Sequence, residues 1–589
     1  METNVVAENP AVEAARKSLN EIYECLDGGK SFILEAGAGS GKTHSLVMAL
    51  RYLIGKQGDE FIRRGKRIAC ITYTNVASEE ITSRTDGHPA VFSATIHAFC
   101  WSLIKGFQVF LREELPKLPK WQERLDEAGG LAGREIEYEL GFASARKEYP
   151  KVSLHHDDVL QLMVRLMDQP KFRKLLVSRY PVIFIDEYQD TNRQFVSSII
   201  DNCVRKGEGP LIGFFGDHWQ QIYGEEDTCG RITDDALAKV QQKSNFRSAP
   251  PVIEVLNKMR PELPQAFSDP DAEGEVAAYH TNSWKGVRRD GKGGGHWKGD
   301  LPEETAHAYL EALRGKLEAD GWDMSSGQTK ILMLTHGVLA SEQGYRGIAK
   351  AFSGFNNSYA KKEDSLIKFL LEVVEPMAVA YEGKRFGEMF RVLGMKIPQI
   401  RRAKDKLEWA RDMSALLQLR QEATIGEVID HLKATGHPRL PDSILQREKE
   451  LREWMEAGEA EESGSKARLK QLLSINYTEV IALSQFVDEH TLFSTKHGVK
   501  GVEFDNVIVV AGRGWNKYDF NKLLEYLANP GDIPADRSAY ERWRNLFYVA
   551  CSRPKKRLAV LFTQELSDTA IQCLSKLFGS KNVFDFSLT

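Results

Sequence analysis

The stretch that decides the fold is YPVIFIDEYQDTN, residues 180–192. Its apolar run, Val182 to Ile185, predicts a strand that is buried on both faces, as in a parallel sheet. The run ends abruptly in Asp186 and Glu187, and further polar side chains follow within one turn. A solvated loop after the strand would explain this acidic end, and so would a functional site at the strand's carboxyl end. The choice depends on what the rest of the chain offers as a partner.

A candidate partner lies upstream, in SFILEAGAGSGKT, residues 31–43. An apolar strand at 32–34 leads into a loop of small residues and then into a helical pattern. This is the spacing of a P-loop, in which backbone N–H groups surround phosphate oxygens at a helix N-terminus. A plain glycine-rich turn is the alternative, and the strand–loop–helix context disfavours it. The predicted nucleotide-binding residues here are Ala36, Gly37, Ala38, Gly39, Ser40, Gly41, Lys42, Thr43 and His44.

Together the two stretches explain each other. Lys42 is expected to reach the β and γ phosphates, and Thr43 to ligate Mg²⁺. A P-loop enzyme also needs a second strand that ends beside the phosphates with an acidic metal ligand and a group that positions water. Asp186 suits the metal and Glu187 suits the water. The sequence therefore predicts an ATPase that uses ATP and Mg²⁺.

Further motifs identify the kind of ATPase. AGAGSGKT and IDEYQDTN resemble the UvrD/Rep/PcrA group of superfamily 1 DNA helicases, and this resemblance extends from about residue 30 to residue 562. The other matching motifs appear in the family's order: ITYTNVASEEI from Ile71, SATIHAF from Ser93, GDHWQQIYG at 216–224, NFRS at 245–248, STKHGVKGVEF at 494–504 and WRNLFYVACSR at 543–553.

The resemblance implies roles for residues outside the P-loop. Arg247 and Arg553 would each offer a cation to the γ-phosphate, where arginines stabilise the transferring phosphoryl group. Gln220 would sense the γ-phosphate, Phe246 would stack on the base, and Glu503 would accept a hydrogen bond from the ribose. Taken alone, either arginine would be interpreted as a solvated surface residue.

The same resemblance implies a track for single-stranded DNA. Hydroxyl and amide groups hold phosphates without reading sequence, and aromatic rings stack on any base. For single positions, an ordinary strand end or a satisfied polar histidine remains the alternative. The predicted contacts are Thr72, Tyr73, Thr74, Asn75, Thr95, His97 and Tyr223, with Thr495, His497 and Lys500 in the second lobe.

Some positions depart from the family pattern. No glutamine precedes Gln57, so the family's adenine-reading glutamine has no counterpart ahead of the P-loop. Glu225 and Glu226 stand where relatives carry a Trp-Arg pair that helps hold DNA, which predicts a weaker grip on single strands. Trp219 is absent from the usual pattern, and it would either substitute as a base platform or belong to the core.

Fold class follows from the alternation of strands and helices, which predicts parallel α/β layers. The resemblance implies two RecA-like P-loop NTPase lobes, each with a mainly helical inserted subdomain. The expected boundaries are residues 1–100 and 176–243 for the first lobe, 101–175 for its insertion, 244–355 and 486–589 for the second lobe, and 356–485 for its insertion.

Composition limits the alternatives. The chain has 589 residues, a formal net charge of −4 and seven cysteines without metal-ligand spacing. We therefore expect reduced, buried thiols in a cytoplasmic protein, and a local basic groove for any anionic partner. The N-terminus METNVVAENP lacks the features of a secretory signal, and no apolar run approaches the ~20 residues of a membrane span.

The leading hypothesis is an ATP-driven 3′–5′ single-stranded DNA translocase and helicase that acts on single strands or tailed duplexes in DNA repair or anti-phage defence. Since the chain has no room for a nuclease domain, we expect a separate nuclease or DNA-binding subunit. Gabija-type defence systems, which pair a small UvrD-like helicase with a nuclease, would fit. A different class of function is a regulatory subunit that senses ATP and DNA ends and gates a nuclease. A purely structural scaffold is disfavoured by the intact catalytic residues.

Overall fold

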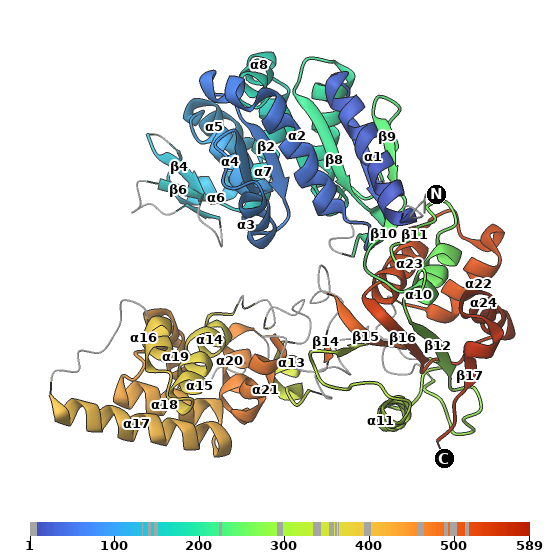
Figure 1. The fold of residues 1–589 in the computed structure, drawn as a ribbon. Coiled ribbons are helices and arrows are strands. Elements are labelled where there is room, and N and C mark those ends of the chain that lie inside the picture. Colours follow the sequence, from blue (N-terminus) through green and yellow to red (C-terminus); the bar gives the residue numbers. More distant parts are fainter. Residues whose placement is uncertain are drawn as a thin grey trace. The chain divides into compact units, whose positions relative to one another are not determined.

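The structure is a computed structural model of the chain, and it describes residues 9–119, 121–131, 133–138, 143–145, 151–222, 227–290, 298–333, 343–352, 359, 362, 364–393, 402–456, 464–487, 493–494, 503–512 and 518–588. The chain forms two compact units (Figure 1). Unit 1 comprises Met1–Ala278, Asn521–Leu558 and Ser567–Phe584, and unit 2 comprises Tyr279–Phe520, Ala559–Leu566 and Asp585–Thr589.

Unit 1 is built on a six-stranded sheet of order β3-β2-β7-β8-β1-β9. All neighbouring strands in it run parallel, so their carboxyl ends meet at one edge. The strands are β1 (Phe32–Ala36), β2 (Ile68–Thr72), β3 (Val91–Thr95), β7 (Val182–Asp186), β8 (Leu211–Gly216) and β9 (Ala238–Gln242). The strands predicted at 32–34 and 182–185 are thus confirmed as β1 and β7, and β8 lies between them.

Side chains on both faces of this sheet are buried, which explains the unbroken apolar run of β7. Val182 and Phe184 pack into one cluster together with Leu34. Ile183 and Ile185 pack into the cluster on the other face. Helices cover both faces, as parallel sheets require.

The helices of unit 1 begin at local signals in the sequence. The Asn9 side chain accepts hydrogen bonds from the N–H groups of Ala11 and Val12, and Pro10 takes the first helical position of α1. The helices are α1 (Pro10–Asp27), α2 (Lys42–Arg63), α3 (Asn75–Arg84), α4 (Ile96–Ile104), α5 (Gln108–Glu114), α6 (Trp121–Glu127), α7 (His156–Met167), α8 (Pro170–Arg179), α9 (Arg193–Ile199), α10 (Pro250–Met259), α22 (Phe520–Ala528), α23 (Ser538–Cys551) and α24 (Asp568–Phe578). The short strands β10 (Ser244–Asn245) and β11 (Ala266–Phe267) flank α10.

The insertion expected at residues 101–175 is not helical throughout. It also contains a three-stranded sheet of order β4-β6-β5, made of β4 (Glu135–Tyr138), β5 (Ser144–Ala145) and β6 (Lys151–Leu154). These strands are too short to show a periodic pattern, so the charged helical segments around them dominated the prediction.

A second six-stranded sheet has the order β14-β13-β15-β16-β12-β17. Its strands are β12 (Glu275–His280), β13 (Thr329–Met333), β14 (Phe493–Ser494), β15 (Phe504–Ala511), β16 (Pro554–Phe562) and β17 (Val583–Asp585). The helices of unit 2 are α11 (Glu303–Ala319), α13 (Arg346–Ala351), α14 (Ser365–Phe369), α15 (Glu375–Glu382), α16 (Phe386–Leu393), α17 (Ala403–Glu422), α18 (Ile425–Thr435), α19 (Asp442–Glu456), α20 (Ser465–Leu473) and α21 (Thr478–Val487). The two parallel sheets with flanking helices confirm the predicted fold class.

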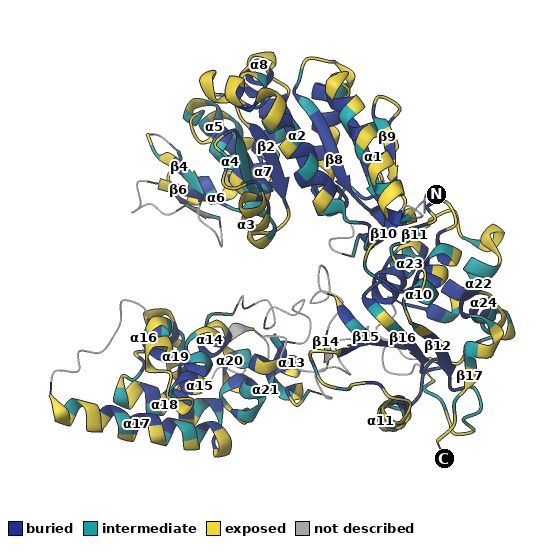
Figure 2. Cartoon of the chain, in the orientation of Figure 1, coloured by how far each residue is buried: buried dark blue, intermediate teal, exposed yellow. Residues whose placement is uncertain are grey.

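A buried ion pair ties two of the unit 2 helices together. The Arg420 guanidinium on α17 donates from Nε to Glu375 Oε1 at 2.8 Å and from Nη2 to Glu375 Oε2 at 2.6 Å. The side chains are only 4% and 3% exposed. Figure 2 shows further buried residues, coloured dark blue, on the helices of this region.

The two compact units divide the chain differently from the four predicted segments. Residues 244–278, which the resemblance assigns to the second lobe, group with the first sheet, and so do α23 and α24. The four-segment division therefore stays a prediction.

The sequence predicted reduced, buried cysteine thiols and no membrane-spanning segment. All seven cysteines are free thiols, and six of them are buried, whereas Cys229 is half-buried. Within the parts of the chain that the structure describes, no helix combines the length and apolarity that crossing a bilayer requires.

Candidate nucleotide site

The loop between β1 and α2 needs glycine at several positions. Gly39 and Gly41 have φ angles of 72° and 82°, in the left-handed region that favours glycine. At Gly37, a Cβ atom would lie 2.7 Å from Gln265 Nε2. The loop therefore has the backbone that a P-loop needs, and larger residues at these three positions would strain or displace it.

Side chains and backbone near β10 and β11 hold the carbonyl groups of this loop. Ala38 O accepts from Asn245 Nδ2 at 3.1 Å and from Gln265 Nε2 at 2.9 Å. Gly39 O accepts from the Phe246 N–H at 2.8 Å. Ser40 O accepts from the Gln242 amide and the Ser244 hydroxyl. These hydrogen bonds hold the backbone of the loop in one conformation.

Gln265 is the amide side chain that packs against Gly37, so it raises the question of base recognition. Its Nε2 donates to Ala38 O at 2.9 Å and to Ser244 O at 2.8 Å, and its Oε1 accepts from Asn245 at 3.3 Å. The polar atoms are thus engaged with the protein itself. Gln265 shapes the loop and does not replace the missing adenine-reading glutamine.

Lys42 and Glu187 form an ion pair at the loop. Lys42 Nζ lies 2.6 Å from Glu187 Oε1. Glu187 has φ 50° and ψ 44°, a left-handed conformation that is uncommon for a residue with a side chain and occurs preferentially at functional sites. Phosphate oxygens would compete with Glu187 for Lys42, so nucleotide binding would release the carboxylate for water.

The predicted metal ligands occupy suitable places. Asp186 ends β7 with 6% exposure, and its Oδ1 accepts the Glu187 N–H at 3.0 Å. Thr43 lies in the first turn of α2. A hydroxyl and a carboxylate are the oxygen ligands that Mg²⁺ takes beside substrate phosphates, so these residues fit that ion, which would neutralise phosphate charge.

Gln220 and Arg553 come together although they are far apart in the sequence. Arg553 is 1% exposed, and its Nη2 lies 3.5 Å from Gln220 Oε1. Gln220 Nε2 in turn donates to Asp217 Oδ2 at 2.8 Å. The predicted sensor and the predicted arginine are therefore in contact.

Arg247 and Phe246 lie against the P-loop. A Cβ on Gly39 would be 2.8 Å from Arg247 Cβ, and one on Gly41 would be 3.6 Å from the Phe246 ring. Arg247 Nη1 donates to Ser552 O at 3.0 Å. Phe246 is 45% exposed, which leaves its ring accessible for stacking.

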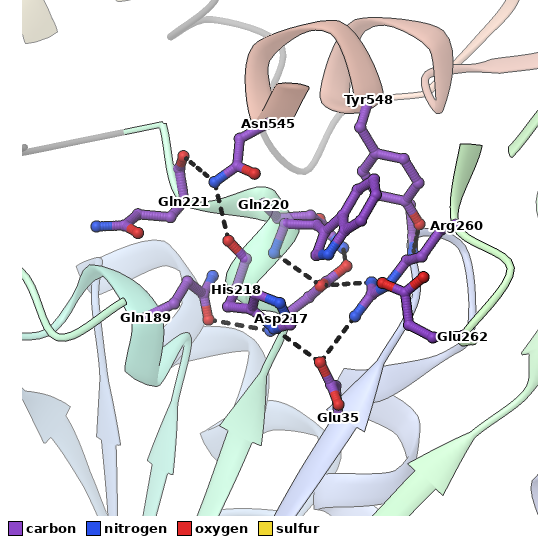
Figure 3. A network of polar contacts seen from close by, with 12 residues as sticks. Glu35, Gln189, Asp217, His218, Gln220, Gln221, Arg260, Glu262, Asn545 and Tyr548 are labelled. Atoms are coloured by element: carbon purple, nitrogen blue, oxygen red, sulfur yellow. Dashed lines mark hydrogen bonds and ion pairs between the residues drawn. The ribbon is translucent and has the colours of Figure 1, made fainter. Parts of the chain in front are cut away.

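A charged network that the sequence motifs did not reveal lies beside these residues (Figure 3). The Arg260 guanidinium is 1% exposed and donates to Asp217 Oδ1 at 2.7 Å and to Glu35 Oε1 at 2.8 Å. His218 Nδ1 also lies 2.7 Å from Glu35 Oε1. Two signals were present in the sequence: a glutamate inside the apolar strand FILEA, and an arginine at the end of the helix VIEVLNKMR.

The charges of this network support one another. Although burial alone would raise the pKa of Glu35, the neighbouring His218, Arg260 and Arg231 lower it below its ordinary value. Burial likewise opposes the charge of Arg260, but Asp217, Tyr548 and Glu35 raise the pKa of the guanidinium above its ordinary value. Both groups are therefore charged at neutral pH.

Trp219 has the core role that the sequence left open. It is 5% exposed, and its ring packs at 74° against the Tyr548 ring with centroids 5.3 Å apart. Arg544 Cζ lies 4.1 Å from the Trp219 ring centroid. The tryptophan thus joins α23 to the residues that follow β8.

The predicted DNA contacts of the first lobe gather at the carboxyl ends of β2 and β3, where Thr72 and Thr95 are register partners. Tyr73 is 44% exposed, and Thr74 and Asn75 are exposed at the start of α3. Thr72 differs, because it is 2% exposed and its hydroxyl donates to Thr74 O at 2.9 Å. Its side chain orders the loop and does not reach the surface.

His97 lies near His156, with ring centroids 4.9 Å apart. Burial, together with the neighbouring His156, lowers the pKa of His97 to about 4. It is therefore neutral at pH 7 and would meet DNA as a neutral hydrogen-bonding group.

Other predicted residues are not placed beside this site. Glu503 is exposed and belongs to unit 2, so its ribose contact stays a prediction. The remaining positions, Tyr223, Glu225, Glu226, Thr495, His497 and Lys500, lie outside the described residues.

Comparisons with known proteins agree with this geometry. The family model of the AAA domain matches residues 22–226, and that of the UvrD-like helicase C-terminal domain matches residues 355–565. The Gabija protein GajB of Bacillus cereus (strain HuB5-5) is 23% identical, over 96% of this chain and 97% of that protein. A probable DNA helicase II homolog of Mycoplasma capricolum subsp. capricolum is 25% identical over 38% of each chain. The ATP-dependent DNA helicase PcrA of Bacillus subtilis (strain 168) is 26% identical over 29% of each chain.

The Lys42–Glu187 pair generates a prediction that separates binding from chemistry. Lys42→Ala should abolish ATP binding or turnover, because the phosphates lose their main side-chain cation. Glu187→Gln should bind ATP at least as tightly as the unaltered chain, since Lys42 is released, but should not hydrolyse it. Filter binding of labelled ATP and phosphate release measure the two steps. Ordinary turnover in Glu187→Gln would remove Glu187 from the catalytic role.

Proposed function

We propose that this chain, which belongs to the UvrD-like helicases of superfamily 1, moves 3′ to 5′ along single-stranded DNA and separates tailed duplexes. As a helicase of this family it hydrolyses ATP. The polarity and the preference for tailed duplexes are our proposal, and they rest on the motifs and on the site geometry.

One observation carries the proposal: residues that are predicted to carry hydrolysis come together from distant segments. Lys42 and Glu187 lie within 2.6 Å, and Gln220 and Arg553 lie within 3.5 Å. Gln220 stands in the segment that directly follows β8, and β8 is the direct neighbour of β1, the strand that leads into the P-loop. Such an arrangement supports a cycle in which γ-phosphate contacts and DNA grip alternate.

The DNA-facing edge supports the same proposal. Tyr73, Thr74 and Asn75 are exposed at the carboxyl end of β2, on the same edge of the sheet as the P-loop. An aromatic ring with flanking hydroxyl and amide groups suits a strand of any sequence. Nucleotide and DNA would thus act on the carboxyl ends of two strands, β1 and β2, of the same sheet.

We further propose that the chain serves in anti-phage defence with a separate nuclease or DNA-binding subunit. A relative that aligns over 96% of this chain and 97% of its own length is named a Gabija protein, GajB. Glu225 and Glu226 stand where a Trp-Arg pair would help hold DNA, so a lone motor would grip weakly. A tethered partner that holds DNA raises its effective concentration without new contacts.

A regulatory role is the second candidate. In that case the chain binds ATP and DNA ends, gates the partner nuclease and unwinds little. The acidic pair at Glu225 and Glu226 favours this alternative, because negative charge at the sequence positions where relatives hold DNA opposes sustained translocation.

The direct test is ATP turnover with and without single-stranded DNA, followed by strand displacement on duplexes with a 3′ or a 5′ tail. We expect DNA to stimulate turnover and the 3′-tailed duplex to be separated, with Glu187→Gln as the inactive control. Stimulation without displacement would support the regulatory role. If single-stranded DNA does not change the rate of ATP turnover, the result would contradict both the helicase function and the regulatory role.

The partner proposal is tested by affinity capture of the tagged chain from its native host. We expect a stable companion with nuclease or DNA-binding activity, docked through the helical insertions at 101–175 or 356–485. Within the complex, Glu225→Trp should change DNA affinity less than in the isolated chain, where one added stack contributes about 1–3 kcal/mol. Capture without a companion, combined with unwinding of kilobase-scale duplexes by the isolated chain, would contradict the proposal.

A further inference from the structure

We infer that Arg260 is a positioning residue for ATP hydrolysis. It orients the Gln220 side-chain amide through Asp217, and it holds the P-loop in place through Tyr548. The inference rests on the proposed function only for the chemistry of ATP turnover. Arg260 lies outside the motifs, directly after α10. It would not touch ATP in this role, and it would act through the residues that do.

The first step is the environment of the guanidinium. Arg260 joins two carboxylates on different strands, Asp217 after β8 and Glu35 on β1. Asp217 is 0% exposed, so its charge has no compensation from water. The planar fork of an arginine reaches both carboxylates at once, whereas the point charge of a lysine does not.

The second step runs from Asp217 to the γ-phosphate sensor. Oδ1 of Asp217 accepts from Arg260 at 2.7 Å and from the Trp219 N–H at 3.0 Å, which fixes the orientation of the carboxylate. The other oxygen, Oδ2, accepts from Gln220 Nε2 at 2.8 Å. The Gln220 amide is thereby oriented so that Oε1 faces Arg553. Removing Arg260 frees the carboxylate on which this orientation depends.

The third step runs from Arg260 to the P-loop. Its Cζ lies 5.9 Å from the Tyr548 ring centroid and 5.1 Å from that of Trp219. The Tyr548 hydroxyl accepts the Ala38 N–H of the P-loop at 3.3 Å. The cation therefore supports a ring from α23 whose hydroxyl contacts the loop directly. Figure 3 shows Arg260 bonded to Asp217 and Glu35, with Tyr548 beside it.

The consequence for catalysis is a site with fixed geometry. A displacement on the order of 1 Å in a positioned group costs roughly 10²-fold in rate. Arg260 holds two such groups, the Gln220 amide and the Ala38 segment, from a position that is itself buried. A residue of this kind affects turnover more than the initial binding of ATP.

The test is a double-mutant cycle on ATP turnover measured without DNA, using Arg260→Lys and Gln220→Ala. We expect Arg260→Lys to lower kcat roughly 10²-fold, with a smaller change in KM. In the Gln220→Ala background the same substitution should lower kcat by clearly less than this, because the path through Asp217 is already lost and only the path through Tyr548 remains. Full multiplication of the two losses would overturn the inference.

A matched control separates positioning from simple loss of stability. Arg420 is also a buried arginine with a two-pronged carboxylate contact, to Glu375, but it belongs to unit 2. Arg420→Lys should lower the melting temperature, as Arg260→Lys does, yet keep kcat per folded molecule. Equal losses of kcat in both variants would show that general destabilisation is responsible and would overturn the inference.

Failure here and failure of the proposed function give different results. The double-mutant cycle measures ATP turnover without DNA. If the unaltered chain hydrolyses ATP but DNA does not change its rate, the helicase proposal is contradicted, and the role of Arg260 can still be tested. If DNA stimulates the unaltered chain and Arg260→Lys retains its full kcat, the helicase proposal stands and the role of Arg260 is refuted.

Discussion

The nucleotide site depends on the pairing of one fully buried carboxylate with one fully buried guanidinium, Asp217 with Arg260. An unpaired charge at either position would be strongly destabilising, because removing one partner of a buried pair costs about 3–5 kcal/mol. The pair forms only if α10 docks against the carboxyl ends of β1 and β8. Docking of α10 in turn places β10 and β11, whose residues hold the P-loop carbonyls. One electrostatic requirement thus orders the loop, the sensor and the arginine.

This arrangement changes how the two-lobe architecture is understood. In the family scheme, Arg247 and Arg553 belong to a second lobe that approaches the P-loop. In this chain, residues 244–278 and α23 form one compact unit with the P-loop sheet. The Phe246 N–H bonds Gly39 O, and the Tyr548 hydroxyl accepts the Ala38 N–H. The loop is therefore shaped by residues that the resemblance assigns to the second lobe, and changes in those residues would reach the phosphates through the loop's backbone.

The sequence was sufficient to predict the elements that depend on local patterns. An apolar run ending in Asp186 and Glu187 predicted β7 and its acidic end, and the small-residue loop between a strand and a helix predicted the P-loop. Long-range features were missed, because the pairing of Glu35 and Asp217 with Arg260 joins three distant segments without any periodic signal. Trp219 could not be assigned for a related reason: only the rings and cations packed around it decide between core and DNA platform. Short strands such as β4 were also missed, because four residues are too few to show a periodic pattern of apolar side chains.

The central claim is that Asp217 and Arg260 assemble the nucleotide site before ATP binds. Hydrogen–deuterium exchange on nucleotide-free protein tests it most directly, through peptides that cover residues 36–43 and 244–250. The account predicts slow exchange at Ala38 and Phe246 in the unaltered chain, and fast exchange at both in Arg260→Lys. Fast exchange at these amides in the unaltered chain, with protection that appears only on adding a non-hydrolysable ATP analogue, would contradict it.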